Sequence, residues 1–401
     1  MVCTGHFTLL RDTMGSTTPP DRHVCAAQTL RVCSKGRKLE APSPKKSRLR
    51  LPLLPRPREV APPSGFRGEA GPGALLSVIR AYGGATRAQL VDTTRLARGT
   101  VQNRLDKLTE SRFIVAGRPA ATTGRPPVVF EFNAAGGYLL TVDMGTTRTR
   151  VGLTDLGCRI LSVIDLDLDI RTGPTPFLAT VADAAARILE GIDPRLMLGV
   201  GLGLPSPVEW SGLMTRPPES EPTDTAWDSV VVADHIRAFL TNAGIGPVPI
   251  AVDKDANVMA IGEWCSTWPD ARDLVALRVG MGVTSGILAG GTVVRGAAGV
   301  AGDIGHIPDP SSDQRCRCGQ LGCADLTAAG RAIVAALGPR GSTITKPQDI
   351  VALANQNDPE VIELVRCSGT RLGNLIGDVI ATLNPRFVVV GGELAYDNPL
   401  L

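Results

Sequence analysis

Four side chains that can bind a metal ion lie within eighteen residues of the sequence: His306, Cys316, Cys318 and Cys323. One imidazole nitrogen and three thiolates form a donor set that suits tetrahedral Zn²⁺. Four protein ligands leave no open position for water, so we predict a structural zinc site that shapes the chain and does not hydrolyse a substrate. The alternative interpretation is a group of three buried free thiols and a hydrogen-bonded histidine.

A second group of residues has the chemistry to hold a phosphate. The segment D-M-G-T-T, from Asp143 to Thr147, falls between two expected strands. A tight turn there would aim the backbone N–H groups of Gly145 and Thr146 and the Thr147 hydroxyl at a phosphate, while Asp143 would hold Mg²⁺ through water. Because D-x-G-T-T also occurs in ordinary hairpins, this segment does not establish phosphate binding by itself.

Asp255 follows one expected strand and begins an expected helix. There its carboxylate can act as a general base, removing a proton from a substrate hydroxyl as that oxygen attacks a phosphoryl group. The alternative role, capping the helix N-terminus, is compatible with catalysis. Asp303, His306 and Asp325 would add further hydroxyl-binding groups, held together by the zinc site between them. Such a set of acceptors suits the recognition of a polyol.

These residues need a scaffold, and the pattern from Tyr138 to the end of the chain predicts an α/β body with two sheets. The expected elements are an antiparallel meander of three strands in 138–168, a helix at 177–192, a buried strand with a glycine-proline loop at 196–210, a strand, polar turn and helix at 249–264, two strands around a glycine loop at 274–294, helices from 328 and at 359–383, and a buried strand at 386–392.

The segment before this body predicts a winged helix-turn-helix. Helical spacing of apolar residues begins at Gly73, Thr86 opens a second helical segment, and Ala97 opens a third, ARGTVQNRLDKLTESRFI, which would be the recognition helix. The next residues, a loop and the alternating segment TGRPPVVFEFN would form two strands around a turn, the wing. Arg125 lies between Gly124 and Pro126 in this turn, so its guanidinium would suit a narrow minor groove.

The expected recognition helix carries side chains suited to DNA. Gln102 and Asn103 have paired donor and acceptor groups that match adenine edges, and Thr100 can reach a phosphate or a base. Arg98 and Arg104 can neutralise phosphates. The alternative is a protein-interaction module, because winged helices also bind proteins. The basic excess of this segment favours double-stranded DNA.

Charge is unevenly distributed along the 401 residues. Lys and Arg outnumber Asp and Glu by 13 to 5 in residues 1–71 and by 9 to 4 in residues 72–133, whereas residues 134–401 carry 20 basic and 30 acidic side chains. A polyanion would therefore bind the basic N-terminal segments, residues 1–133. The acidic body, residues 134–401, must bind a different kind of ligand. Residues 1–71 are rich in Pro, Arg and Lys without periodicity, so we expect a disordered basic tail.

Length, hydropathy and cysteine content indicate the number of domains and the cellular compartment. Its length suits two or three domains, which we place at 1–71, 72–133 and 134–401. There is no run of about 18 apolar residues, so we expect no membrane span. The amino terminus has no signal-peptide layout. Nine cysteines without a pairing pattern, three of them assigned to the metal, fit a reducing cytoplasm.

The order of these motifs resembles the ROK family of repressors and sugar kinases: winged helix, D-x-G-T-T, G-x-P, K-D-A-N, G-x-G, A-G-D-I-G-H, C-x-C-G-x-x-G-C-x-D and V-V-G-G. The resemblance covers about residues 73–396. It implies a two-lobed, actin/hexokinase-like ATPase fold, a sugar between the lobes with zinc beside it, and homodimers or homotetramers. It also implies these roles: Asp255 as catalytic base, Asp143–Thr147 and Gly280–Gly286 (with Gly280 and Gly282) as phosphate loops, Gly391 and Gly392 on the nucleotide side, and His306 shared between zinc and a sugar hydroxyl.

Departures from the family's kinases favour a regulator. Lys254 stands where the kinases usually have Asn, and Asp303 and Asp325 stand where they have Glu for the sugar. In the second phosphate loop, Met281 replaces the usual Thr and Thr284 replaces a usual Gly, which removes a hydroxyl donor and crowds the backbone. The chain ends soon after VVGG, whereas relatives continue with a further helical segment, so we expect a fold truncated at the C-terminus.

We therefore predict a cytoplasmic, DNA-binding transcriptional regulator, a repressor rather than an activator, controlled by a sugar or sugar-phosphate effector bound by Lys254, Asp255, Asp303, His306 and Asp325. The ammonium of Lys254 would pair with a phosphate or carboxylate of that effector. The competing hypothesis is an Mg²⁺-ATP-dependent sugar kinase that uses Asp255 as its base. A third is an interaction module that binds neither nucleotide nor sugar.

Overall fold

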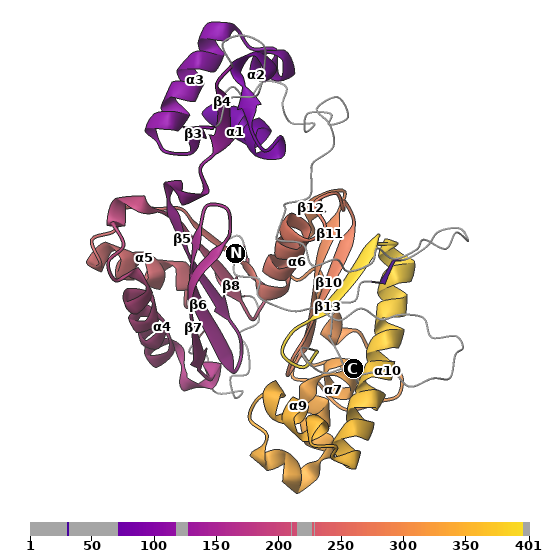
Figure 1. Ribbon diagram of the computed structural model, residues 1–401. Helices are drawn as coiled ribbons and strands as arrows, with labels where there is room; N and C mark the ends of the chain where they lie inside the picture. Colours follow the sequence, from indigo (N-terminus) through magenta and orange to yellow (C-terminus); the bar gives the residue numbers. More distant parts are fainter. Residues whose placement is uncertain are drawn as a thin grey trace.

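The computed structural model describes residues 30–31, 71–117, 127–209, 211–214, 227 and 229–395. They form a small head of helices and a sheet, above a body of two α/β lobes that lie side by side (Figure 1). Most of the tail predicted for residues 1–71 lies outside the described residues. Within the described part, no helix is both long and apolar enough to cross a bilayer.

The head, residues 71–117 and 127–133, combines three helices with a three-stranded sheet of order β2-β4-β3. Fully buried Leu75, Leu90 and Leu105, one from each helix, meet in its core. Thr86 caps the second helix through a reciprocal capping box with Gln89, which explains why that helix begins there. The elements are α1 (Pro72–Ala81), β2 (Ala85–Thr86), α2 (Arg87–Thr94), α3 (Arg98–Glu110), β3 (Ile114–Ala116) and β4 (Val129–Phe132).

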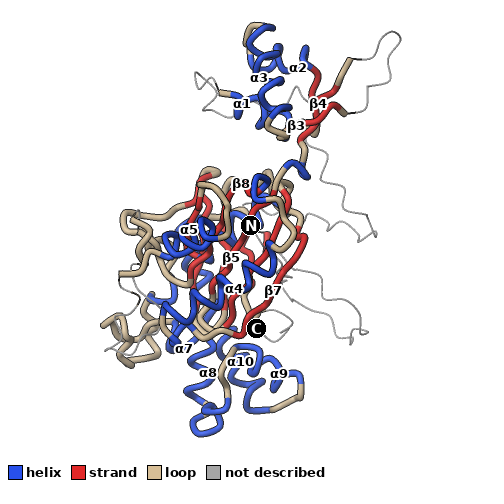
Figure 2. The backbone as a smooth tube through the Cα atoms, turned by 90° about the vertical axis from the view of Figure 1, so that its left-hand side faces the viewer, coloured by secondary structure: helices blue, strands red, loops and turns tan. Residues whose placement is uncertain are grey.

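Lobe 1 is built on a five-stranded sheet of order β7-β6-β5-β8-β9. The first three strands form the predicted antiparallel meander, and β8 and β9 continue it in parallel. Helices α4 and α5 cover one face, where they bury the apolar residues of β5 and β6 (Figure 2). The elements are β5 (Tyr138–Met144), β6 (Arg148–Asp155), β7 (Ile160–Asp167), α4 (Pro174–Leu189), β8 (Met197–Leu204), α5 (Val232–Asn242) and β9 (Ile250–Lys254).

Lobe 2 is a second five-stranded sheet, of order β1-β13-β10-β11-β12. Helix α6 packs on one face, and α7 to α10 cover the other. The short strand β1, within the region expected to be disordered, pairs antiparallel with β13. The elements are β1 (Leu30–Arg31), α6 (Asp255–Ser266), β10 (Leu274–Val279), β11 (Val283–Ala289), β12 (Thr292–Val293), α7 (Asp325–Ala328), α8 (Gly330–Ala336), α9 (Pro347–Asn355), α10 (Pro359–Leu383) and β13 (Phe387–Gly391).

The two sheets present the ends of their parallel strands to one another. In lobe 1, β5, β8 and β9 run in parallel, and in lobe 2, β10 and β13 do so. Functional groups collect at the carboxyl ends of parallel strands, because the following loops leave the sheet there. The loops after these five strands therefore meet between the lobes, and helix α6 passes directly from β9 to the sheet of lobe 2.

Candidate functional site

A cleft of about 530 Å³ lies between the lobes. Most of the predicted sugar and phosphate residues line it, although they come from segments far apart in the sequence. Those in the wall are Gly145, Thr146, Thr147, Asp255, Gly280, Gly282, Asp303, His306 and Asp325. Lys254, Asp143, Gly391 and Gly392 do not line the cleft.

Asp255 lies at the centre of this wall, as the first residue of α6. Its side chain is 7% exposed, and its Oδ1 accepts a hydrogen bond of 2.6 Å from the backbone N–H of Ala256. Burial, partly offset by the charge of Arg278, raises the pKa of Asp255 from its ordinary 3.8 to about 6. At neutral pH it is therefore mostly ionised and can accept a hydrogen bond from a ligand hydroxyl.

Arg278 is a central residue of the site that sequence reasoning missed. It sits near the end of β10 and contacts three carboxylates: Nη1 lies 3.2 Å from Asp143 Oδ1, Nε lies 3.3 Å from Asp255 Oδ2, and Nη2 lies 3.2 Å from Glu393 Oε1. A signal for it existed, because a single arginine in the apolar run L-V-A-L-R-V must find partners when the strand is buried.

Asp303, His306 and Asp325 also line the cleft. Asp325, 6% exposed, accepts a hydrogen bond of 2.7 Å from the Val283 N–H, and Arg331 Nε lies 3.7 Å from its Oδ2. Burial raises the pKa of Asp325, and Arg331 opposes that rise. The carboxylate thus ties the second glycine loop to α7 and still faces the cleft. These three residues add two carboxylates and an imidazole to Asp255.

The structure corrects the role predicted for Lys254. Its side chain is 1% exposed, and Nζ donates a hydrogen bond of 2.8 Å to the carbonyl oxygen of Ala301. Burial lowers its pKa, while Asp303, Asp255 and Asp253 act in the opposite direction. The ammonium therefore lies behind the wall and braces it, and it does not pair with an effector in the cleft.

The glycines of the phosphate loops also differ from prediction. The Gly145 N–H, expected to face a phosphate, donates to the Arg148 carbonyl at 2.8 Å and closes the hairpin between β5 and β6. The Gly280 N–H likewise donates to the Gly282 carbonyl at 2.9 Å. Gly392 has φ +99°, and a Cβ there would lie 2.4 Å from the Val279 carbonyl oxygen, so its packing against β10 requires glycine.

The residues on the nucleotide side of the cleft do not fit Mg²⁺-ATP. Asp143, the expected Mg²⁺ residue, is paired with Arg278. Glu393 Oε2 lies 3.0 Å from the position of a Cβ on Gly280, so a carboxylate stands over the loop that would approach a phosphate. A guanidinium on the metal residue and a negative group over the phosphate loop both disfavour a magnesium nucleotide.

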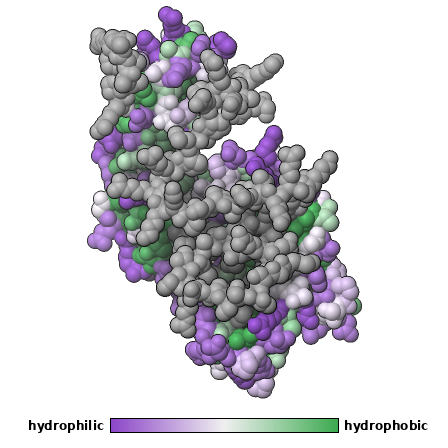
Figure 3. Space-filling view, turned by 45° about the vertical axis from the view of Figure 1, so that its right-hand side comes forward, coloured by the Kyte–Doolittle hydropathy of each residue, from purple (hydrophilic) through white to green (hydrophobic). Residues whose placement is uncertain are grey.

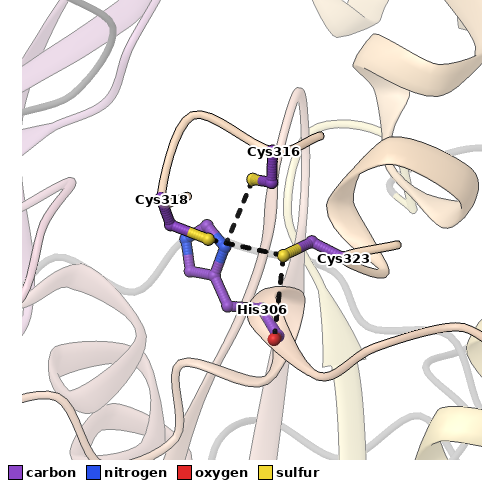
Figure 4. Close-up of side chains that lie close together, drawn as sticks. All are labelled: His306, Cys316, Cys318 and Cys323. Atoms are coloured by element: carbon purple, nitrogen blue, oxygen red, sulfur yellow. Dashed lines mark hydrogen bonds between the residues drawn. The ribbon is translucent and has the colours of Figure 1, made fainter. Parts of the chain in front are cut away.

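The cysteine and histidine side chains do form a compact cluster. The four predicted donors lie within 4.8 Å of one another, and the side chains converge on one point (Figure 4). Cys316 Sγ is 3.6 Å from His306 Nδ1, and Cys318 Sγ is 3.5 Å from Cys323 Sγ. Tetrahedral zinc with ordinary bond lengths separates its donors by about 3.6–3.8 Å. The spacing and chemistry of the donors therefore fit Zn²⁺.

The head presents part of the predicted DNA-contact set. Arg98, Thr100 and Asn103 are exposed on α3. Gln102 is half-buried; its Oε1 accepts from Arg87 Nη1 at 2.9 Å and its Nε2 donates to Asp106 at 2.8 Å.

Two of the predicted DNA contacts stand apart from that set. Arg104 is 9% exposed, so its prediction as a phosphate contact is wrong in this conformation. Arg125 lies outside the described residues.

Hydrophilic residues cover most of the described surface of the head in Figure 3.

A family model described as the ROK family matches residues 139–401. The chain belongs to the ROK family. The xylose repressor of Caldicellulosiruptor bescii is 24% identical over 329 residues, covering 78% of this chain and 80% of that protein. The transcriptional dual regulator NagC of Escherichia coli is 26% identical over 342 residues, covering 82% and 81%. A glucokinase of Halalkalibacterium halodurans is 26% identical over 278 residues, covering 64% and 81%.

A solved structure shows the same fold. The crystal structure of a ROK family transcriptional regulator, a homolog of the E. coli MLC protein, has a TM-score of 0.63 and 23% identity, and it covers 82% of this chain and 84% of its own. Together with the two sheets described above, this likeness shows the predicted actin/hexokinase-like α/β fold of the ROK type.

Proposed function

We propose that this protein is a DNA-binding transcriptional repressor of sugar metabolism or transport genes, controlled by a sugar or sugar derivative in the cleft. The observation that carries the proposal is the extent of the similarity. The xylose repressor and NagC match about four-fifths of this chain, whereas the glucokinase matches 64%. The family model itself begins at residue 139, so similarity to the regulators extends over more of the chain than the ROK domain alone.

The head, which we assign to residues 72–133 as a winged helix-turn-helix, would bind the operator. Exposed Arg98 and Thr100 at the start of α3 suit phosphates, and Asn103 suits an adenine edge. Gln102 would read a base only by exchanging its bonds to Arg87 and Asp106. Arg125 would serve in the wing as a minor-groove contact.

The effector would lie in the cleft of the ROK domain, residues 134–401. Carboxylates suit sugar hydroxyls because each oxygen accepts more than one hydrogen bond. Asp255, Asp303 and Asp325 supply three carboxylates and His306 an imidazole in the same wall. Because Lys254 is buried behind this wall, its ammonium is not available to an anionic group of the ligand. The hydroxyl groups of the ligand would therefore determine recognition, and an anionic group is not required.

Zn²⁺ would be held by His306, Cys316, Cys318 and Cys323 in a structural role. Bound there, the ion would fix the loop that carries His306 against the loop that precedes Asp325. Three cysteine side chains and an imidazole that converge within 4.8 Å of one another form a donor set that one Zn²⁺ ion can share. The cluster thereby positions two of the proposed sugar-binding residues.

Regulation requires that the effector bind one arrangement of the lobes better than another. We propose that a homodimer or homotetramer places two heads on one duplex, and that the angle between the lobes sets the spacing of the two α3 helices. A ligand that contacts both Asp255, where the chain passes from β9 of lobe 1 into α6, and Asp325 of lobe 2 would favour one angle. Repression would be lost when that angle no longer matches the half-site spacing.

The alternative, an ATP-dependent sugar kinase with Asp255 as its base, keeps support from the position of Asp255 in the cleft. The ion pair between Asp143 and Arg278 and the carboxylate of Glu393 over Gly280 weigh against it. Incubation with Mg²⁺-ATP and a panel of hexoses, hexosamines and N-acyl sugars separates the two functions. Phosphorylation that disappears in Asp255→Ala would overturn the proposal of a regulator without kinase activity.

The experiment that tests the proposed function is selection of bound sequences from random duplex DNA, repeated with each sugar of the same panel. The expected result is a palindromic sequence whose recovery is lost when one sugar is present. Recovery of no sequence above background with zinc-loaded, full-length protein would contradict the proposal. The third possibility, an interaction module, would be favoured if no sugar also shifted the melting temperature.

A further inference from the structure

The side chain of Arg278 joins three parts of the body that are far apart in the sequence. Asp143 lies near the end of β5 in lobe 1, Asp255 begins the helix that crosses from lobe 1 to lobe 2, and Glu393 follows β13 in lobe 2. Each guanidinium nitrogen that makes a contact faces a different carboxylate, at 3.2 or 3.3 Å. The hydrogen bonds from Nη1 and Nη2 go to two different carboxylates, Asp143 and Glu393, so the guanidinium connects separate groups.

These ion pairs are largely buried, so they affect the stability of the body. The Arg278 side chain is 14% exposed, and the side chains of Asp143, Asp255 and Glu393 are 23%, 7% and 21% exposed. A buried charge is tolerated only when opposite charges surround it. Burial disfavours the charged guanidinium, but Asp143, Asp255 and Glu393 together hold its pKa well above the ordinary value. Arg278 is therefore a permanent cation at this place, at any pH at which the protein is folded.

Three carboxylates that converge on one point are a donor set for a hard divalent cation such as Mg²⁺ or Mn²⁺. In this chain the point is filled by a covalently attached cation, and Glu393 Oε2 also closes the approach to Gly280. Arg148 and Arg150 also act on Glu393, and Lys254 acts on Asp255, but Arg278 is the group that contacts all three carboxylates. A protein that lacked the guanidinium would have to protonate these groups, separate them or bind another cation.

We propose that Arg278 is a built-in cation that takes the place of a divalent metal ion at the junction of the lobes and ties them together through Asp143, Asp255 and Glu393. Arg278 is a positioning residue, because it orients the Asp255 carboxylate that faces the cleft. The proposal goes beyond the regulator function and does not depend on it, since it concerns the cohesion of the body whether or not the head binds DNA.

The variant Arg278→Gln tests directly whether the guanidinium takes the place of a metal ion. Glutamine keeps a polar side chain but removes the cation, so the variant should gain a binding site for one Mn²⁺ ion. Titration of zinc-saturated, full-length protein with Mn²⁺, followed by electron paramagnetic resonance, should show affinity at least tenfold higher than in the wild type. Mn²⁺ should also raise the melting temperature of the variant. The double variant Arg278→Gln/Glu393→Gln should lose the added site.

Arg340→Gln is the matched control. Arg340 is also shared by two carboxylates, Asp358 and Glu360, but it is 51% exposed on the surface of lobe 2. Removing a surface partner leaves the carboxylates in water, so this variant should gain no Mn²⁺ site. Folded Arg278→Gln protein that binds Mn²⁺ no more tightly than the wild type or Arg340→Gln would overturn the proposal.

Arg278→Lys provides a second test that does not require the charge to be lost. The ammonium is a compact point charge and cannot span three carboxylates as the planar fork does. The variant should bind no added Mn²⁺, yet hydrogen exchange at the start of α6 and in the loop after β13 should be at least threefold faster than in the wild type. Exchange equal to that of the wild type at both places would contradict the claim that the planar guanidinium is needed to span the three carboxylates.

Discussion

Replacing Asp255 by Asn should stabilise the protein at neutral pH, although Asp255 lies at the centre of the cleft. Burial, partly offset by Arg278, raises its pKa from 3.8 to about 6, so the folded chain holds the proton more tightly than the unfolded chain. Keeping the carboxylate ionised therefore costs folding free energy above pH 6. Because one pKa unit corresponds to about 1.4 kcal/mol, the full cost is about 3 kcal/mol.

An uncharged amide avoids this cost, which already includes the contact with Arg278, so the expected gain in unfolding free energy is up to about 3 kcal/mol at pH 7.5. The gain should shrink as the pH falls from about 6 to about 4 and vanish below that, where Asp255 is protonated in both states. Urea unfolding followed by tryptophan fluorescence measures it, since Trp264 lies near the end of α6 and Trp268 just after it.

Asp253→Asn is the matched control for this measurement. Asp253 lies two residues earlier, and its Oδ2 is 2.7 Å from Arg295 Nη2, so the same chemical change should there reduce stability. A lower unfolding free energy for Asp255→Asn than for the wild type at pH 7.5 would refute the reasoning. It would show that the ion pair with Arg278 outweighs the burial of the carboxylate.

The metal cluster, the recognition helix and the core of the head each have a measurable consequence. Elemental mass spectrometry should find about one zinc per chain, and Cys318→Ser should lower both this content and the melting temperature; equal values would contradict a structural zinc site. Arg98→Ala should weaken binding to every duplex and reduce the salt slope by about 1, whereas Asn103→Ala should relax base preference. Leu105→Ala should destabilise the head by about 2–5 kcal/mol and abolish DNA binding. Calorimetry should find unchanged sugar affinity in that variant if the body folds independently.

Local patterns in the sequence predict much of the fold. Helix α10 occupies the predicted range Pro359–Leu383, because Asp358 caps its start and Asn384 ends it in the left-handed conformation. The four metal donors were predictable because they lie close together in the chain. Helix α5 (Val232–Asn242) and helix α9 (Pro347–Asn355) were not predicted, although the spacing of buried Val232, Ile236 and Leu240 in α5 is a clear helical signal that sequence analysis could have used.

Contacts between distant segments explain the errors within the site. Arg278 meets Asp143 and Glu393 across 135 and 115 residues, a separation at which no local spacing indicates proximity. Lys254 precedes Asp255 in sequence, which suggested a shared cleft, but it ends a strand and its side chain points to Ala301 behind the wall. Arg104 shares the recognition helix with exposed side chains, yet it faces the side of α3 that the head buries.

The central claim is that a sugar in the cleft and DNA on the head influence each other's binding. The most direct test is the dissociation constant of the active sugar, measured by calorimetry with and without a saturating amount of the selected duplex. The duplex should weaken sugar binding by the same factor, at least fivefold, by which the sugar weakens DNA binding, because coupling between two sites is reciprocal. Asp303→Ala should lose the sugar and leave the affinity for DNA unchanged. Equal sugar affinity with and without the duplex, in protein that binds both, would contradict the claim.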